Sequence, residues 1–299
     1  MALRDEGKAV LEVGLNELAT RQENPHVPYG PGEVAADIVA CVRAGATLVH
    51  FHARDEAGAQ IWYDAEPSRS VLNRAAQEVD LLAYPSYIER LDHVWELAAA
   101  APPDYRLVLS PFDPKQHVKS PSWDESARRF EVIRFHGTES DDGYPAVVHE
   151  FERRGMVPNV AIFDSSDLRW VVCAARAGIL RAPLNLKIFF SDRWLGMFEP
   201  SVEALDFVLS RLPADLDHET VIVPYAMTSR DRTETLLRRA LERGHGIRVG
   251  IGDNARAFPE ATNAGLVAWA AGLMAQYGCR PASAADLRRR CGMHARAAA

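Results

Sequence analysis

Residues 31–52 read PGEVAADIVACVRAGATLVHFH and contain the signals of a helix, a turn and a strand in succession. Pro31 stands near the start of an amphipathic run and Gly45 follows its end, which is the usual distribution of proline and glycine around a helix. The segment from Thr47 to His52 is short, apolar and rich in β-favouring residues, which predicts a buried strand. The stretch therefore predicts one complete unit of an α/β fold.

Two histidines stand at the end of that predicted strand. Because side chains alternate faces along a strand, His50 and His52 are expected to point to one side, and Val49 and Phe51 to the other. Two imidazoles at this spacing can bind one divalent metal ion, although a histidine here could also be hydrogen-bonded in the core. We expect His50 and His52 to be metal ligands.

The same alternation of strands and helices runs along the chain. The predicted strands are 10–16, 47–52, 79–83, 105–109, 160–163, 184–190, 220–223 and 247–251. The predicted helices are 31–44, 67–77, 87–100, 144–154, 168–177, 202–212, 230–243, 262–276 and 284–290. Eight such units in about 270 residues favour a parallel (β/α)8 TIM barrel, an α/β fold.

A doubly wound open sheet is the competing architecture, but no GxGxxG motif opens the first helix. No Pro/Gly/Ser linker divides the chain, so we expect a single barrel domain over residues 1–299 with a short C-terminal helical extension. The least regular region is 110–142, with a short predicted strand at 131–135. Long irregular segments are typical of lids and binding loops.

Bulk composition narrows the class of partner. The net charge is -7 and the pI is about 5.8, which argues against nucleic acid or an anionic membrane as the main partner. Neither a signal peptide nor a membrane-spanning apolar run is recognised, so we expect a cytoplasmic protein that binds small molecules. The four cysteines lie far apart and are expected to be reduced thiols.

In a (β/α)8 barrel the active site lies at the carboxyl ends of the strands. Arg248 stands in the middle of the last predicted strand, and a buried arginine needs a carboxylate or an anionic ligand, for which Asp253 and the substrate are candidates. Asp113 is expected to be structural, and Asp164 to cap the next helix. The polar residues at strand ends that we expect to bind substrate are Glu17, Arg54, Ser86 and Ser110.

Three segments together resemble the β-keto acid cleavage enzymes, whose founding member is the 3-keto-5-aminohexanoate cleavage enzyme of lysine fermentation. They are residues 24–29 (NPHVPY), 44–55 (AGATLVHFHARD) and 246–254 (GIRVGIGDN). The resemblance implies a zinc-containing (β/α)8 barrel, usually a homotetramer. It implies a reaction in which a β-keto acid and acetyl-CoA give acetoacetate and a new acyl-CoA.

By position, the resemblance implies that His50 and His52 are zinc ligands and that Arg248 and Asp253 are the catalytic pair. Glu17 is similar in location to an acidic residue that contacts the substrate. The family pattern has a glutamate as third metal ligand where this chain has Gly252.

With glycine at that position, we expect water or a bound anion to complete the metal's shell, with Glu17 or Asp253 as further candidates. Two alternatives remain open at this stage. The first is a metal-dependent aldolase or hydrolase that uses no CoA. The second is a barrel that has lost its metal and only binds a ligand.

Overall fold

The structure is a computed structural model of the 299-residue chain. It describes residues 1–62, 64–86, 109–112, 118–124, 127–135, 148–149, 151–153 and 156–293. The predicted helix at 87–100, most of the predicted strand at 105–109, most of the predicted helix at 144–154 and Asp113 lie outside the described residues.

Eight parallel strands form the central sheet. They are β2 (Leu11–Gly14), β3 (Leu48–Phe51), β4 (Ala83–Pro85), β5 (Leu109–Phe112), β8 (Val157–Ile162), β9 (Leu184–Phe190), β10 (His218–Pro224) and β11 (Gly246–Val249). Their order in the sheet is β4-β3-β2-β11-β10-β9-β8-β5, and β4 and β5 at its two ends contact each other. β11, the last of these strands in the sequence, pairs with β2, the first. The sheet therefore curls into the predicted (β/α)8 barrel.

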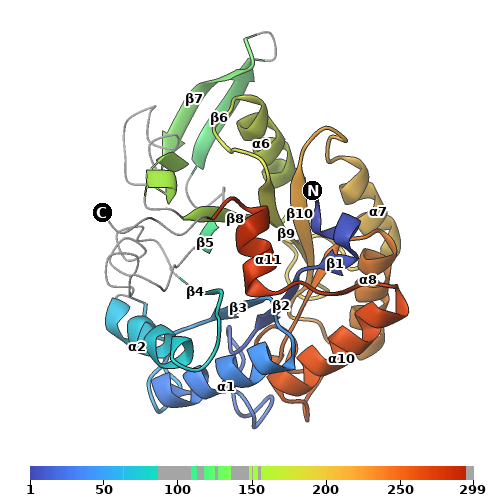
Figure 1. Ribbon diagram of the computed structural model, residues 1–299. Coiled ribbons are helices and arrows are strands. Elements are labelled where there is room, and N and C mark those ends of the chain that lie inside the picture. The colour runs from blue at the N-terminus through green and yellow to red at the C-terminus, as the bar shows by residue number, and fades with distance from the viewer. Residues whose placement is uncertain are drawn as a thin grey trace.

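Helices cover the outside of this sheet (Figure 1). They are α1 (Gly30–Ala44), α2 (Ala65–Ala76), α6 (Ser165–Arg176), α7 (Val202–Ser210), α8 (Arg230–Glu242) and α10 (Asn263–Gln276), with the short helices α9 (Ile251–Asn254) and α11 (Ala284–Arg290) towards the C-terminus. Most begin at a side chain that accepts a hydrogen bond from the first turn, as an N-cap does. These caps are Asp64, Asp164, Ser201, Ser229, Thr262 and Ser283.

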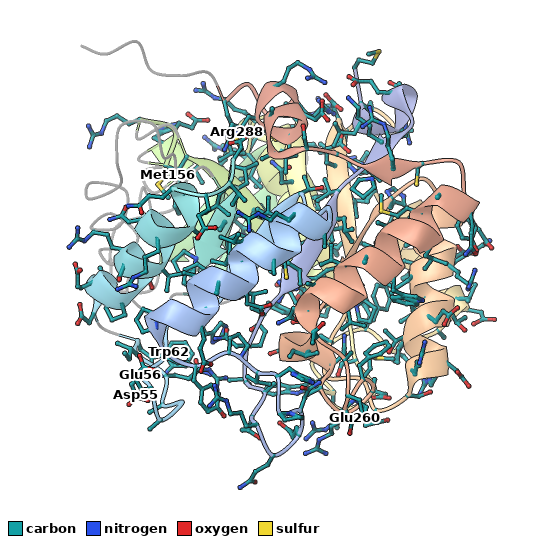
Figure 2. The ribbon with its side chains drawn as sticks, turned by 60° about the horizontal axis from the view of Figure 1, so that its bottom comes forward. Asp55, Glu56, Trp62, Met156, Glu260 and Arg288 are labelled. Atoms are coloured by element: carbon teal, nitrogen blue, oxygen red, sulfur yellow. The ribbon has the colours of Figure 1, made fainter. Side chains whose placement is uncertain are left out.

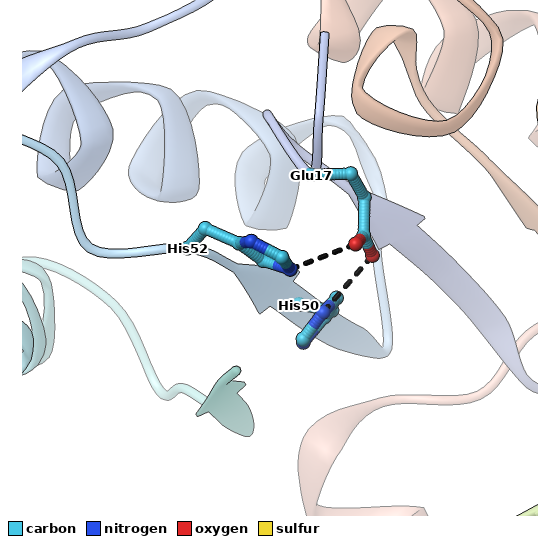
Figure 3. Close-up of side chains that lie close together, drawn as sticks. All are labelled: Glu17, His50 and His52. Atoms are coloured by element: carbon cyan, nitrogen blue, oxygen red, sulfur yellow. Dashed lines mark ion pairs between the residues drawn. The ribbon is translucent and has the colours of Figure 1, made fainter. Parts of the chain in front are cut away.

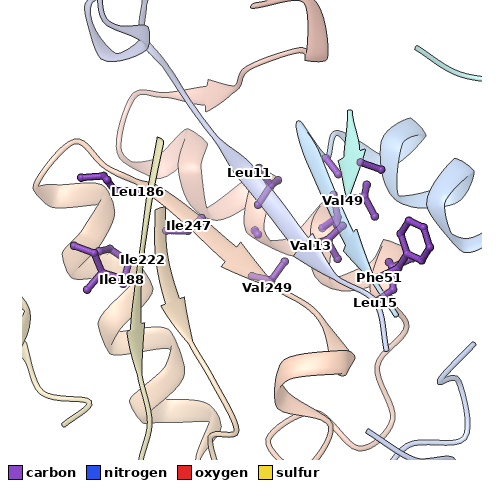
Figure 4. Close-up of a cluster of buried hydrophobic side chains, with 14 of the residues drawn as sticks. Leu11, Val13, Leu15, Val49, Phe51, Leu186, Ile188, Ile222, Ile247 and Val249 are labelled. Atoms are coloured by element: carbon purple, nitrogen blue, oxygen red, sulfur yellow. The ribbon is translucent and has the colours of Figure 1, made fainter. Parts of the chain in front are cut away.

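The two faces of the sheet bury different side chains. Odd-numbered residues of β2, such as Leu11 and Val13, pack outward against the helices, together with the other side chains drawn in Figure 4. A second apolar cluster, which includes Leu48 and Val223, fills the inside of the barrel. Because side chains alternate between the two faces of a strand, Glu12 points to the inner face while Leu11 and Val13 point outward. The strands therefore carry a few charged side chains inside the barrel.

Most of the predicted elements are confirmed, with ends that move by a few residues. The predicted strand at 79–83 is misplaced, because the strand in the structure, β4, begins only at Ala83. The described part of region 110–142 is more regular than expected: β6 (Val118–Asp124) pairs antiparallel with β7 (Arg129–Phe135). A two-stranded sheet of β1 (Lys8–Ala9) and β12 (Arg280–Pro281), preceded by a 3-10 helix at Leu3–Glu6, was not predicted.

The loops that follow the strands gather at one end of the barrel. In Figure 2, Asp55, Glu56 and Trp62, which follow β3, lie at the same end as Glu260, which follows β11 and α9; Met156 and Arg288 lie towards the opposite end. The carboxyl ends of parallel strands thus share one edge, where active sites of this fold lie. No helix within the described ranges is long and apolar enough to cross a membrane.

Candidate active site

Both histidines lie at the carboxyl end of β3 and face the same side. His50 is the third residue of β3 and His52 follows its last residue, and their ring centroids are 5.2 Å apart. The Nδ1 atom of His50 lies 3.1 Å from the carbonyl oxygen of Tyr84. A carbonyl can only accept, so Nδ1–H donates and the Nε2 atom of the neutral ring carries a lone pair.

The same reasoning fixes the tautomer of His52. Its Nδ1 atom lies 2.7 Å from Oε1 of Gln60, whose Nε2 donates to the carbonyl of Glu17 at 2.6 Å. That second bond orients the amide, so His52 donates from Nδ1 and its Nε2 atom faces the site. Metal-binding histidines are commonly oriented by such partners of their other ring nitrogen.

Glu17 supplies the third group of the cluster. Its Oε1 lies 2.9 Å from Nε2 of His50 and its Oε2 lies 2.8 Å from Nε2 of His52 (Figure 3). The backbone of Glu17 has φ +24°, which is strained for a residue with a side chain. Arg54 supports this conformation, since it donates to the carbonyl oxygens of Asn16 at 2.8 Å and Glu17 at 2.6 Å.

Electrostatics favours an ionised Glu17 and a neutral His50. Burial opposes ionisation of Glu17, but the nearby imidazoles and Arg248 hold its pKa well below the usual range. Burial lowers the pKa of His50 to about 4, although Glu17 opposes this shift. One ligand atom each from Glu17, His50 and His52 lies within 4.8 Å of the others. A metal ion between them would be held by the carboxylate and by the Nε2 atoms of the two imidazoles.

The donor set therefore fits a divalent metal. Two histidines and one glutamate, with a fourth position open, are the ligands of many catalytic zinc sites. Among the described residues, Glu17, His50 and His52 are the only group identified with ligand atoms close enough to hold a metal.

Arg248 connects Glu17 to Asp253. Its Nε and Nη2 donate to the two carboxylate oxygens of Asp253 at 2.8 and 2.7 Å, and Nη2 also pairs with Glu17. Its Nη1 donates to Glu12 at 3.0 Å. Burial raises the pKa of Asp253 to about 7, although Arg248 opposes the shift. A carboxyl group with that pKa is suited to exchange protons near neutral pH.

The structure assigns places to the other predicted residues. Arg54 is buried and bonded to backbone carbonyls, which favours positioning of Glu17; its contact with substrate stays a prediction. Ser86 is half-buried after β4, and Ser110 belongs to β5, of which only the backbone is described. Asp164 caps α6, as predicted, by accepting from the N–H groups of Ser166 and Asp167.

The sequence analysis gave no role to several other polar residues of the site. Gln60 orients His52 from the loop after β3, and Asn16 bridges β2 to His52 through both of its amide atoms. On the inner face, Tyr84 donates to Glu12 and accepts from Lys187 at 3.1 Å. The signal for Lys187 was its place between outward-facing Leu186 and Ile188, the same pattern that singled out Arg248.

Gly252 has no room for a side chain. A Cβ atom there would lie 2.4 Å from the backbone nitrogen of Asn16 and 2.7 Å from the carbonyl carbon of Leu15. The close approach brings the segment after β11 against the segment that carries Glu17. A side chain therefore does not fit at position 252, whereas the carboxylate of Glu17 contacts both histidines.

We expect Gly252→Ala to destabilise the protein by about 1–3 kcal/mol, the usual cost of overpacking, because backbone cannot move aside easily. The measurement is the urea midpoint of unfolding. Gly272→Ala is the matched control, since a Cβ at Gly272, in α10, would meet nothing within 4 Å. An unfolding midpoint of Gly252→Ala equal to that of the wild type would contradict this packing.

Comparison with known proteins identifies the family of the chain. The family profile of the beta-keto acid cleavage enzymes matches residues 8–293. The chain belongs to the β-keto acid cleavage enzyme family. The sequence resemblance is thereby confirmed, and the family is one of enzymes. A search of curated proteins found no match for this family member.

Solved structures share the fold of this β-keto acid cleavage family member at low identity. ObcA, solved in a ternary complex with a C4-CoA adduct and oxalate, is 16% identical with a TM-score of 0.62, covering 90% of this chain and 68% of ObcA. A truncated 3-deoxy-D-arabino-heptulosonate 7-phosphate synthase from Thermotoga maritima is 10% identical with a TM-score of 0.52, covering 92% and 90%. Dihydropteroate synthase of Yersinia pestis is 12% identical with a TM-score of 0.53, covering 93% and 94%.

Proposed function

We propose that the protein condenses a β-keto acid with acetyl-CoA and releases acetoacetate and a new acyl-CoA. The observation that carries the proposal is the convergence of His50, His52 and Glu17 beside the Arg248–Asp253 pair at the carboxyl edge of the barrel. The family membership supports the reaction class. ObcA, which has this fold, was solved with a CoA adduct and, separately, with oxaloacetate, a keto acid.

We assign zinc to the cluster of His50, His52 and Glu17. The ion, when bound, supplies a Lewis acid for the keto and carboxylate oxygens of the substrate. The tautomers set by Tyr84 and Gln60 direct both Nε2 atoms towards the ion. This assignment adds Glu17 to the two ligands expected from sequence. The homotetramer and the cytoplasmic location stay predictions.

Asp253 is the proposed base. It removes a proton from C2 of the keto acid, and Arg248 holds the carboxylate in place through two hydrogen bonds. The C2 carbanion attacks the acetyl carbonyl of acetyl-CoA and expels the CoA thiolate. That thiolate attacks the original keto carbon, the C2–C3 bond breaks, and the acetoacetate carbanion takes up a proton. The products are acetoacetate and the new acyl-CoA.

The test is a panel of β-keto acids, each incubated with acetyl-CoA and the zinc-loaded protein, with acetoacetate and acyl-CoA measured by mass spectrometry. The expected result is both products in equal amounts, lost when the protein is stripped with a chelator and restored by zinc. Cleavage of a keto acid at the same rate without acetyl-CoA would overturn the proposal and identify a CoA-independent aldolase or hydrolase.

A further inference from the structure

A cavity of about 190 Å³ opens beside Asp253 at the mouth of the barrel. Its walls come from segments that follow four strands: Leu18 after β2, Arg193 and Trp194 after β9, Tyr225 after β10, and Asp253 after β11. The loops after the last two strands of (β/α)8 barrels are frequent sites of anion binding. The cavity thus adjoins the proposed base but none of the proposed metal ligands.

The loop that carries Arg193 and Trp194 has a defined shape. The hydroxyl oxygen of Ser191 accepts from the backbone N–H of Arg193 at 3.2 Å and of Trp194 at 3.0 Å. The N–H of Met197 donates to the carbonyl of Trp194 at 3.0 Å, and the N–H of Ser191 to that of Phe198 at 3.0 Å. These bonds hold the two side chains at the wall of the cavity.

The two arginines in the wall of the cavity differ in their partners. Arg256, also in its wall, is neutralised by Glu23 at 2.9 Å, and the carboxylate of Asp192 accepts hydrogen bonds from Thr228. In the part of the chain that the structure describes, no carboxylate lies within 4.0 Å of the exposed guanidinium of Arg193. An exposed arginine is ordinarily solvated, but this one lines a cavity that reaches Asp253.

The apolar part of the wall suits a short carbon chain. Trp194 is 47% and Leu18 is 49% exposed, and the ring of Trp194 meets that of Tyr225 edge to face at 6.3 Å between centroids. At roughly 30 Å³ for each water in the liquid, the cavity holds the equivalent of a few water molecules. That volume accommodates a short side chain with a terminal group, but not a whole acyl-CoA.

We propose that this cavity is an anion subsite in which Arg193 binds an acidic group carried by one of the two substrates. The group is either a carboxylate at the far end of the β-keto acid or a phosphate of the acyl-CoA. The apolar wall of Trp194 and Leu18 contacts the methylene chain that leads to it. The inference rests on the proposed function, because Asp253 must act on the same bound substrate.

The test compares matched substrates with and without the acidic group, in the wild type and in Arg193→Ala. The keto acids are 3-oxoadipate and 3-oxohexanoate, which have chains of the same length; the thioesters are acetyl-CoA and S-acetylpantetheine. A charge-assisted hydrogen bond is typically equivalent to roughly 10- to 100-fold in affinity. We expect kcat/KM to fall by about that factor for one charged member only, with its uncharged partner unchanged.

The substrate pair whose charged member loses kcat/KM identifies the source of the anion. A loss in the keto acid pair indicates a distal carboxylate, and a loss in the thioester pair indicates a phosphate. Arg211→Ala, which removes an exposed arginine at the end of α7, is the control and should change neither pair. Equal losses for charged and uncharged members, or no loss at all, would overturn the subsite.

Calorimetric titration separates this outcome from failure of the proposed function. 3-Oxoadipate and CoA are titrated singly, so no turnover is required. We expect Arg193→Ala to weaken binding of one of them by at least about 10-fold. Unchanged binding of both would reject the subsite even if the protein makes acetoacetate. Weakened binding in a protein without acetoacetate formation would retain the subsite and reject the reaction.

Discussion

Asp253→Asn is expected to lower the rate of acetoacetate formation by about 10²–10⁴-fold, the usual contribution of a well-placed general base. Asparagine keeps the size of the side chain and one acceptor for Arg248, so fold and metal content should remain. It cannot take the C2 proton. The measurement is kcat with saturating acetyl-CoA and an accepted keto acid, together with metal content and circular dichroism.

Asp286→Asn provides the matched control. Asp286 pairs with Lys8 beside the small sheet of β1 and β12, away from the site, and its loss should leave kcat unchanged. If Asp253 instead only fixes the segment after β11, Asp253→Asn would retain activity within about threefold, far below the effect of a base. That result would exclude Asp253 as the base.

The pH dependence gives a second readout for the same residue. The base must be deprotonated to act, and burial raises the pKa of Asp253 from 3.8 to about 7. Activity should therefore fall as the pH is lowered, in a range nearer to 7 than to the ordinary carboxyl value. The fall of kcat/KM at low pH should disappear in Asp253→Asn. If the variant shows the same fall, the titrating group is not Asp253.

Glu17→Gln is expected to remove most of the bound metal. Within the described residues, the carboxylate supplies the only negative charge that contacts both histidines, and an amide is a weaker, neutral ligand. The loss in metal affinity should exceed the roughly 10–100-fold that is typical when a residue supporting a ligand is changed. Elemental analysis after dialysis, and competition with a chromophoric chelator, measure the change.

His52→Ala should lose metal as Glu17→Gln does, because it removes a ligand from the same cluster by an independent change. Glu23→Gln is the control, since Glu23 pairs with Arg256 outside the cluster. If Glu17→Gln keeps wild-type metal affinity but raises KM for the keto acid, Glu17 is a substrate contact, as the sequence resemblance suggested. The two roles are thus separable.

Much of the architecture could be predicted because hydrophobic periodicity and the residues that end or cap each element are local signals. Strand β9 and helix α11 were predicted with the ends that the structure has, and Asp164 was predicted to cap α6. Strand β4 was misplaced because its short run Ala83–Pro85 follows an apolar stretch that resembles a strand equally well. The pairing of β1 with β12 joins the two ends of the chain, and no local pattern encodes such a contact.

The candidate site also has a part that could be predicted from the sequence and a part that could not. Sequence alone determined that His50 and His52 share a face, and that Arg248 in an apolar strand needs an acid, because both follow from alternation along one strand. Only the tertiary structure decided which acid meets the histidines. Glu17 reaches them because Gly252 lets two backbone segments touch and Arg54 and Gln60 hold the carbonyl of Glu17. Such contacts join residues dozens to hundreds of positions apart, and depend on packing that no single segment specifies.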